Sequence, residues 1–376
     1  MARLTVLSDS LLTTHYLPME IGVPKETKDR EFRVGLTPSS VGALSRNHTV
    51  FVETNAGIGS GFTDAEYQQV GAKIVPDAAM VWDKELVVKV KEPLPDEYQY
   101  LSQQLLFTYL HLAADRNLTK VLMGSGTTAI AYETVELDNG TLPLLSPMSV
   151  IAGRLSVQFG ARYLEKQQGG RGVLLGGVPG VSPGKVVILG GGVVGTEAAR
   201  IAVGMGARVQ IIDINVERLS YLETLFGSRV ELLYSTPAQI DQAVIDADLL
   251  VGAVLVVGRK APILVSRELV SRMRPGSVII DVAVDQGGCI ETVRPTSHTQ
   301  PTYVEENVVH FGVPNMPGAV PWTATQALNN STLPYVLRLA NYGASALEKD
   351  AVLAKGLNVD NGKIIHPAVR EVFSDL

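Results

Sequence analysis

Short apolar segments alternate with helical patterns along most of the chain, and this alternation is typical of an α/β protein. Between residues 19 and 145, apolar runs rich in valine, leucine and isoleucine predict strands, while residues 38–46 and 64–70 predict helices. We therefore expect a mostly parallel sheet with helices beside it. The strand candidates in this part of the chain are residues 50–52, 86–90, 105–110 and 129–132.

A long amphipathic segment follows at residues 146–168. Ser146 is its expected N-cap, Pro147 its first helical residue and the glycine pair 169–170 its stop. A helix of about 20 residues spans about 30 Å, which is enough to run from one domain to another. The glycine-rich stretch behind it contains the apolar residues 173–175, which predict a short strand or a turn.

Six residues at 190–195, Gly-Gly-Gly-Val-Val-Gly, follow the apolar run 186–189 directly. A second apolar run ends in Asp213, eighteen residues beyond the last glycine. A strand, a glycine turn, a helix and a second strand that ends in an acidic residue, in this order, form the dinucleotide-binding fingerprint. It predicts NAD, since the charge of Asp213 would repel the extra phosphate of NADP. The alternative is an ordinary strand-to-helix turn.

Each glycine of the fingerprint has a distinct expected role. Gly190 permits the tight turn, Gly192 lets backbone N–H groups approach a pyrophosphate, and Gly195 lets the helix pack closely on its strand. The N-terminus of that helix adds partial positive charge for the phosphates.

Two more buried strands are predicted at residues 248–254 and 277–283, and a helix at 323–344. The chain after that helix is too short for a core of its own, so we expect it to return to the first domain. The fold class predicted is α/β with two Rossmann-like domains of parallel sheets. The domain ranges are 19–145 plus 322–376 for a discontinuous substrate domain, 146–321 for the NAD-binding domain, and 1–18 for a poorly ordered extension.

Composition narrows the function further. With 376 residues, 46% of them hydrophobic, the chain can bury a large core in about two domains. The net charge of −6 argues against nucleic acid as the main partner, and no apolar run is long enough for a membrane span. The first eighteen residues do not resemble a secretory signal. A single cysteine, Cys289, excludes an internal disulfide and favours the cytoplasm.

Four polar residues are candidates for chemistry beside a nicotinamide. Arg33 could hold a carboxylate with its planar fork, and Lys91, at a strand end, could polarise a carbonyl. His111 could transfer a proton near neutral pH. Asp285, at another strand tip, could face the nicotinamide ribose or a substrate amine. The alternatives are a surface cation, a solvated strand end, a core histidine and a turn aspartate.

Other chemistries have little support. The chain contains neither a Gly-x-x-x-x-Gly-Lys-Ser/Thr loop nor a His-Glu-x-x-His pair. Residues 180–184 have the letters of a nucleophile elbow, but a strand follows them where that motif needs a helix, so they predict a turn. Six scattered histidines do not predict a metal site.

Seven sequence blocks together resemble the L-alanine dehydrogenase family, in order from residue 19 nearly to the C-terminus. Several of them are shared with the NAD-binding part of proton-translocating transhydrogenase, so the combination of Arg33, Lys91, His111 and Asp285 carries the resemblance to the dehydrogenase. The blocks are residues 20–26, 31–34, 89–93, 110–113, 169–173, 281–288 and 315–317.

The resemblance implies reversible oxidative deamination of L-alanine by NAD, which gives pyruvate, ammonium and NADH. It implies that Arg33 binds the substrate carboxylate, Lys91 polarises the keto oxygen and His111 is the general acid/base, assisted by Asp285. It also implies a homohexamer. The other residues it implies are Tyr109, Met148 and Asn315 for the substrate, and Ser149, Asp213, Arg218, Ser235, Val254 and Met316 for the cofactor.

Two other functions stay open at this point. A transhydrogenase component would pass hydride between nucleotides and dock on a membrane partner, and it needs no amino-acid site. A catalytically silent NAD-binding protein would keep the fold without converging polar residues. Formation of NADH that depends on alanine separates both from the dehydrogenase.

Overall fold

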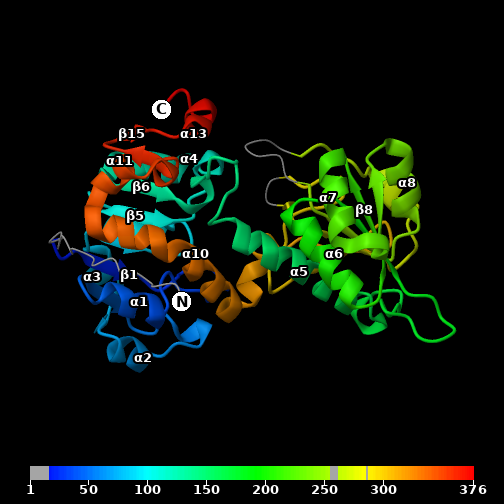
Figure 1. Cartoon of the computed structure of the whole chain (residues 1–376), viewed down its shortest axis with the longest axis horizontal. Helices are drawn as coiled ribbons and strands as arrows, with labels where there is room; N and C mark the ends of the chain where they lie inside the picture. The colour runs from blue at the N-terminus through cyan, green and yellow to red at the C-terminus, as the bar shows by residue number, and fades with distance from the viewer. Residues whose placement is uncertain (1–16, 255–260, 285–286) are drawn as a thin grey trace, which may run out of the picture.

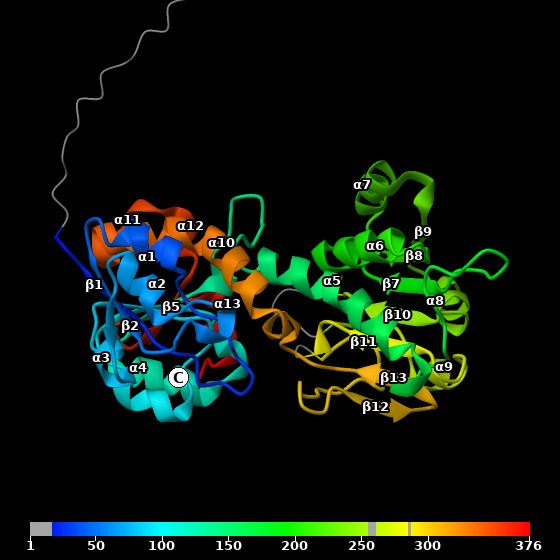
Figure 2. The ribbon, with the colours of Figure 1, turned by 90° about the horizontal axis from the view of Figure 1, so that it is seen from below.

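The computed structural model describes residues 17–254, 261–284 and 287–376. In it the chain forms two lobes, each built around one sheet, with α5 (Ser146–Tyr163) and α10 (Pro321–Tyr342) running between them (Figures 1 and 2). We call the lobe that contains β1 (Glu20–Val23) the first lobe and the lobe that contains β7 (Lys185–Leu189) the second.

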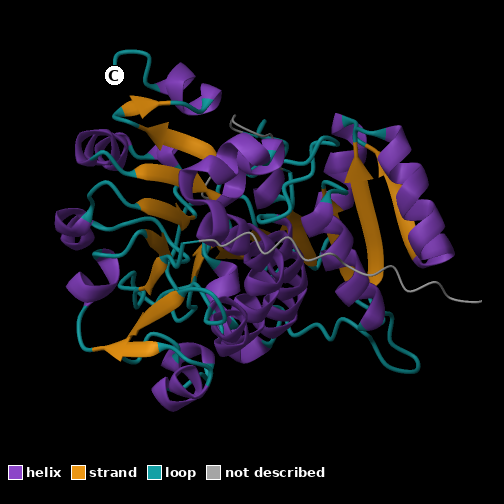
Figure 3. Cartoon of the chain, turned by 60° about the vertical axis from the view of Figure 1, so that its left-hand side comes forward, coloured by secondary structure: helices purple, strands orange, loops and turns teal. Residues whose placement is uncertain are grey.

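The first sheet has eight strands in the order β15-β14-β6-β5-β4-β1-β2-β3, and helices lie on both sides of it (Figure 3). Strands β1 to β6 are parallel, while β14 and β15 return antiparallel at the β6 edge. The C-terminal part of the chain thus joins the first sheet. The remaining strands are β2 (Thr49–Glu53), β3 (Lys73–Val75), β4 (Leu86–Val88), β5 (Leu105–Thr108), β6 (Thr128–Ala131), β14 (Leu357–Asp360) and β15 (Lys363–Ile364).

The second sheet has seven strands in the order β12-β13-β11-β10-β7-β8-β9, all parallel except the edge strand β12. Read from β9, its parallel part has the 3-2-1-4-5-6 order of a dinucleotide-binding fold. The prediction of an α/β fold with mainly parallel sheets is confirmed. The remaining strands are β8 (Arg208–Asp213), β9 (Val230–Tyr234), β10 (Leu249–Gly252), β11 (Val278–Asp281), β12 (Thr302–Glu305) and β13 (Val308–Phe311).

Helices cover both sheets, so the central strands are buried on both faces and are mostly apolar, as parallel strands usually are, with a buried polar residue at the carboxyl end of β5 and of β11. One continuous cluster of buried side chains extends from Ile21 in β1 through Leu155 in α5 to Ile280 in β11. The other helices are α1 (Pro38–Leu44), α2 (Asp64–Gln69), α3 (Ala78–Trp82), α4 (Arg116–Ser125), α6 (Val193–Gly204), α7 (Val216–Phe226), α8 (Pro237–Ile245), α9 (Arg267–Ser271), α11 (Ala346–Lys349), α12 (Ala351–Ala354) and α13 (Pro367–Val372).

The ends of α5 differ from those expected. Ser146 is not the N-cap, because Leu145 before it is already helical and the Ser146 N–H donates to the Leu142 carbonyl. The helix ends at Tyr163 rather than near residue 168, since the backbone of Glu165 is extended and a separate 3-10 turn follows at Lys166–Gln168. Residues 173–175 form no strand in the described structure, but Leu174 and Leu175 belong to a turn, the second alternative predicted, in which the Gly177 N–H donates to the Leu174 carbonyl over 3.0 Å.

Helix α5 packs backbone to backbone against the N-terminal turn of α6. A Cβ atom on Gly153 of α5 would lie 2.3 Å from the carbonyl oxygen of Val194 in α6. Because no side chain fits in this gap, only a glycine at residue 153 lets α5 lie this close to the second lobe.

We therefore expect Gly153→Ala to lower the stability of the protein by about 1–3 kcal/mol, the usual cost of overpacking a core. The matched control is Gly124→Ala in α4, where a Cβ meets nothing within 4 Å and the better helix propensity of alanine stabilises by up to about 1 kcal/mol. Urea unfolding measures both. Equal stability of the two variants would contradict the tight α5–α6 contact.

Candidate functional site

The candidate residues follow the carboxyl ends of strands in both sheets. In each sheet the strand order reverses between two central strands, β1 and β4 in the first and β7 and β10 in the second. Ligands of open α/β sheets bind in the crevice outside such a reversal. Lys91 comes shortly after β4, His111 after β5 and Gly190 directly after β7.

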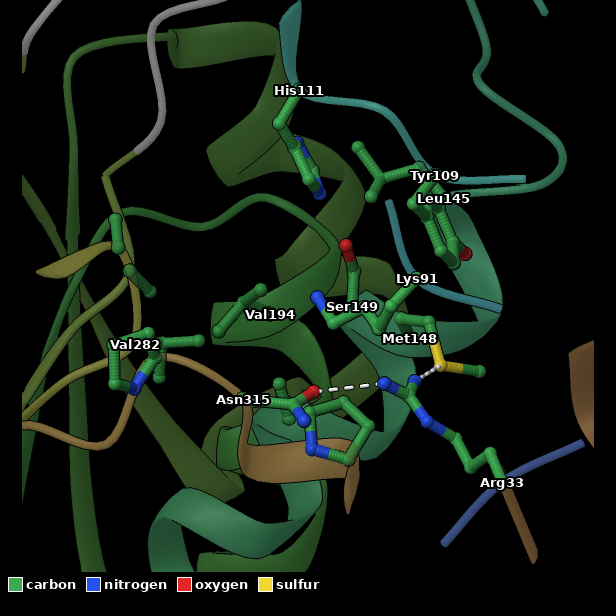
Figure 4. A pocket seen from close by; sticks show the side chains of 15 residues that line it. Arg33, Lys91, Tyr109, His111, Leu145, Met148, Ser149, Val194, Val282 and Asn315 are labelled. Atoms are coloured by element: carbon green, nitrogen blue, oxygen red, sulfur yellow. Dashed lines mark hydrogen bonds between the residues drawn. The ribbon is translucent and has the colours of Figure 1, made fainter. Parts of the chain in front are cut away.

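Between the lobes lies a cavity with a volume of about 140 Å³ (Figure 4). Arg33 and His111 lie on opposite sides of it, and Lys91 extends between them. The structure thus brings residues far apart in the sequence into one small site. The sequence candidates that line the cavity are Arg33, Lys91, Tyr109, His111, Met148, Ser149 and Asn315.

Arg33 is a buried cation, not a surface one, with 2% of its side chain exposed. Its Nε donates to Glu31 Oε1 and its Nη2 to Glu31 Oε2, each over 2.6 Å. This bidentate pair occupies one edge of the guanidinium. On the other edge, Nη1 contacts the sulfur of Met148 at 3.1 Å in the wall of the cavity.

Asn315 connects this ion pair to the second lobe. It follows β13, and its amide oxygen accepts from Arg33 Nη2 while its amide nitrogen donates to Glu31 Oε2, both over 2.9 Å. Opposite ends of one amide group therefore match the cation and the anion. This contact is made between residues 284 apart in the chain, so it forms only when the lobes lie together.

Lys91 brings a second positive charge into the cavity. Burial lowers the pKa of its amine, and the nearby guanidinium of Arg33 lowers this pKa further. Within the described residues the amine has no hydrogen bond or ion pair. The amine is thus available to a ligand, and its lowered pKa makes it easier to deprotonate than an exposed lysine.

His111 has an unusual backbone, with a left-handed φ of 50°. The carboxylate of Glu133 holds this conformation, because its Oε1 accepts from the His111 backbone N–H over 2.6 Å and lies 4.0 Å from Nδ1 of the ring. The ring stacks on Tyr109 with an interplanar angle of 7° and is 43% exposed. It is therefore accessible from the cavity rather than a core histidine.

Two further contacts shape the walls. The Tyr109 hydroxyl donates to the Leu144 carbonyl over 2.6 Å, so the ring of Tyr109 lines the cavity while its polar end points away. Glu26 Oε1 accepts from the backbone N–H of Val90 over 2.6 Å and from that of Lys91 over 3.3 Å. Sequence reasoning missed Glu26, Glu31 and Glu133, whose roles depend on contacts in space.

A groove of about 610 Å³ adjoins the cavity along the carboxyl edge of the second sheet. The cavity and the groove share four residues in their walls and are therefore adjacent: Leu145, Ser149, Val194 and Ala253. The sequence-predicted cofactor residues that line the groove are Ser149, Gly190, Gly192, Asp213, Ser235 and Val254.

The glycine turn has the geometry that the fingerprint requires. Gly190 has a φ of 97°, and a Cβ on Gly195 would lie 1.9 Å from the Gly190 carbonyl oxygen. A Cβ on Gly192 would meet nothing within 4 Å, so the turn is open on the side of the groove. Asp213 Oδ2 accepts from the Gly191 N–H over 2.5 Å, which fixes this carboxylate at the groove.

Apart from Gly195 in the turn, two of the predicted cofactor residues line neither the cavity nor the groove. Arg218 donates from Nε to the Gly191 carbonyl over 2.5 Å and from Nη2 to the Thr196 hydroxyl over 2.6 Å, so it supports the turn from beside the groove. Met316 is buried and lines neither cavity nor groove. Asp285 lies outside the described residues. Within the described part of the chain, no cluster of His, Cys, Asp or Glu is arranged to hold a metal ion.

Comparisons with known proteins agree with this site. Residues 22–152 match the model of the alanine dehydrogenase/PNT N-terminal domain, and residues 156–367 match that of the C-terminal domain. The chain belongs to the alanine dehydrogenase/PNT family. The resemblance inferred from the sequence blocks is confirmed.

Similar proteins cover nearly the whole chain. An alanine dehydrogenase of Bacillus subtilis is 57% identical over 93% of this chain and 94% of its own length, and one of Methanococcus maripaludis is 56% identical over 93% and 95%. A solved L-alanine dehydrogenase structure matches with 73% identity and a TM-score of 0.93, covering 95% of this chain and 99% of its own. The solved structure of a transhydrogenase from Sinorhizobium meliloti shares the fold. It is 23% identical, has a TM-score of 0.79, and the match covers 93% of this chain and 99% of its own.

The buried ion pair between Glu31 and Arg33 predicts how the stability of the protein depends on pH. Pairing with Arg33 outweighs burial and lowers the pKa of Glu31 from 4.5 to about 2. Ionised Glu31 therefore stabilises the fold fully above pH 4.5, and this contribution is lost as the pH falls from 4.5 towards 2. We expect Glu31→Gln to be destabilised near neutral pH by about 3–5 kcal/mol, the usual cost of breaking a buried pair.

The free energy of unfolding of the wild type and Glu31→Gln, measured in urea over a range of pH, tests this. The difference in the free energy of unfolding between the two proteins should be constant between about pH 5 and pH 8 and should become smaller below the ordinary glutamate pKa. A difference that does not depend on pH would show that Glu31 acts through packing and not through its charge.

Proposed function

We propose that this chain is an NAD-dependent L-alanine dehydrogenase that catalyses reversible oxidative deamination. The observation that carries the proposal is the convergence of Nη1 of Arg33, the amine of Lys91 and the ring of His111 in one small cavity that adjoins the dinucleotide groove. Relatives more than 50% identical over most of the chain carry the name alanine dehydrogenase.

The described residues fit NAD. The N–H groups at the N-terminus of α6 and the open glycine turn suit a pyrophosphate, and Asp213 suits the two ribose hydroxyls. The wall shared by groove and cavity, which includes Val194 and Ala253, is where the nicotinamide would meet the substrate. Bound there, NAD would accept the hydride from the substrate carbon.

Arg33 and Lys91 suit a small 2-amino or 2-oxo acid. Nη1 of Arg33 can donate to a carboxylate, because Glu31 and Asn315 bind the rest of the guanidinium and leave Nη1, beside Met148, for the ligand. Lys91 can donate to the neighbouring oxygen of a keto acid. The apolar walls provided by Leu145, Met148 and Ala152 leave room for a short aliphatic side chain such as the methyl group of alanine.

The balanced reaction takes L-alanine, NAD and water to pyruvate, ammonium, NADH and a proton. The α-ammonium group first releases the proton of the overall equation, and loss of hydride from the α-carbon of the resulting amine gives an iminium ion. Water adds to this ion, and the carbinolamine then expels ammonia. His111 accepts the proton of the attacking water and returns one to the leaving nitrogen, a role open to a ring that reaches the cavity. Lys91 stabilises the oxygen that becomes the keto group.

Finer points are also part of the proposal. Asp285 assists proton transfer, as the family resemblance implies, and Arg218 contributes to the cofactor site by holding the glycine turn. The homohexamer rests on the same resemblance, and the cytoplasm rests on the single cysteine, Cys289. No helix in the described part of the chain is both long and apolar enough to cross a membrane.

A steady-state assay of NAD reduction across a panel of amino acids tests the function. We expect turnover with L-alanine that is at least about tenfold above the turnover with other amino acids, because one methylene in an apolar pocket changes rates by about 10–200-fold. The same assay with NADP in place of NAD tests whether Asp213 excludes the extra phosphate of NADP. If no amino acid supports turnover, the proposed function is refuted, while the description of the fold is unaffected.

Replacement of His111 tests the proton-transfer role. We expect His111→Ala to lower kcat by about 10²–10⁴-fold, the usual contribution of general acid/base catalysis, with little change in the dissociation constant of NADH. Stopped-flow turnover and fluorescence titration of NADH measure the two quantities. Equal losses in both would mean that His111 serves cofactor binding instead.

A further inference from the structure

Asp281, the last residue of β11, has a fully buried carboxylate. Its Oδ1 accepts from the Ala283 N–H over 3.0 Å, and its Oδ2 accepts from the Cys289 N–H over 2.8 Å. The two oxygens of one carboxylate therefore hold both ends of the loop between residues 282 and 289.

Burial of this charge is costly. Desolvation raises the pKa of Asp281, and within the described residues no cation pairs with it, so backbone N–H groups are its main compensation. The surrounding chain also leaves space for it. A Cβ on Gly252 would lie 2.8 Å from the Asp281 Cγ, and one on Gly288, whose φ is 65°, would lie 2.6 Å from Oδ2.

A carboxylate is required for both contacts. Asparagine has the same shape but only one acceptor oxygen, and its NH₂ group would face the N–H of either Ala283 or Cys289. One end of the loop would then lose its hydrogen bond and meet a donor instead. Asp281→Asn is thus a small change that releases one end of the loop.

The loop held in this way forms one wall of the cavity. Val282 and Ala283 line the cavity, and the Val282 N–H donates to the Gly252 carbonyl over 2.9 Å, directly before Ala253. Ala253 belongs to the walls of both cavity and groove. The position of the loop therefore fixes the wall at the place where the substrate and the cofactor ring meet.

We propose that Asp281 is a positioning residue for hydride transfer, whose carboxylate holds the cavity wall at Val282 and Ala283 and so sets the distance between the reacting carbons. This inference rests on the proposed dehydrogenase function and uses only Val282, Ala283 and the hydrogen bonds of the Asp281 carboxylate. Asp285, which is in the same loop, lies outside the described residues and carries no part of the argument.

The test compares Asp281→Asn with the wild type in full-length protein, using L-alanine and L-alanine deuterated at the α-carbon. We expect kcat to fall by about 10–100-fold, since a displacement of about 1 Å from the productive geometry costs up to about 10²-fold in rate. The deuterium isotope effect on kcat should rise as hydride transfer becomes slower than the other steps, while the KM for NAD changes much less.

Asp248 offers a matched control in the same sheet. It is also buried, and its Oδ2 accepts from the Lys185 N–H over 2.8 Å, but it precedes β10 at the opposite edge, away from the cavity. Asp248→Asn should lower stability with an unchanged isotope effect. If both variants change kcat and the isotope effect alike, Asp281 acts only on stability and the proposal is overturned.

The outcomes remain distinguishable if folding is impaired. An isotope effect does not depend on the fraction of folded enzyme, so partial unfolding of Asp281→Asn does not obscure the result. If that variant does not fold, Gly288→Ala displaces the same carboxylate and should raise the isotope effect in the same way; an unchanged isotope effect would overturn the proposal. A wild type without alanine-dependent turnover would refute the proposed function, whereas an active wild type with an unaffected Asp281→Asn would refute this inference alone.

Discussion

The buried ion pair between Glu31 and Arg33 is the interaction on which the site depends. An isolated guanidinium at this depth would be strongly disfavoured, and the bidentate carboxylate makes it tolerable. The same carboxylate decides which edge of Arg33 faces the cavity. Because Asn315 of the second lobe contacts both charges, the pair also connects the docking of the two lobes to the shape of the site.

Carboxylates that accept backbone N–H groups recur around the cavity and the groove. Glu26 holds the backbone before Lys91, Glu133 holds that of His111, Asp213 holds the glycine turn and Asp281 holds the loop after β11. Loops at the carboxyl ends of parallel strands contain few regular hydrogen bonds, so side-chain acceptors take their place. The chain thereby uses rigid local contacts to position groups that come from both sheets.

Local patterns in the sequence predicted the helices, strands and turns well, but they did not predict which distant side chains contact each other. The glycine turn at 190–195 was predictable because strand, turn and helix are adjacent in the chain. Glu31 and Asn315 are 284 residues apart, and no periodicity connects them. The expected N-cap at Ser146 was wrong because the preceding turn already supplies a helical carbonyl, that of Leu142. Arg33 was identified as a ligand, but its burial against Glu31 needed the fold.

A crystal structure of the protein with NADH and pyruvate tests the central claim most directly. The account predicts that the carboxylate of pyruvate accepts a hydrogen bond from Nη1 of Arg33, while Nε and Nη2 remain bound to Glu31 and the keto oxygen lies near the amine of Lys91. A carboxylate bound away from Arg33, or an Arg33 side chain separated from Glu31 in the complex, would contradict it.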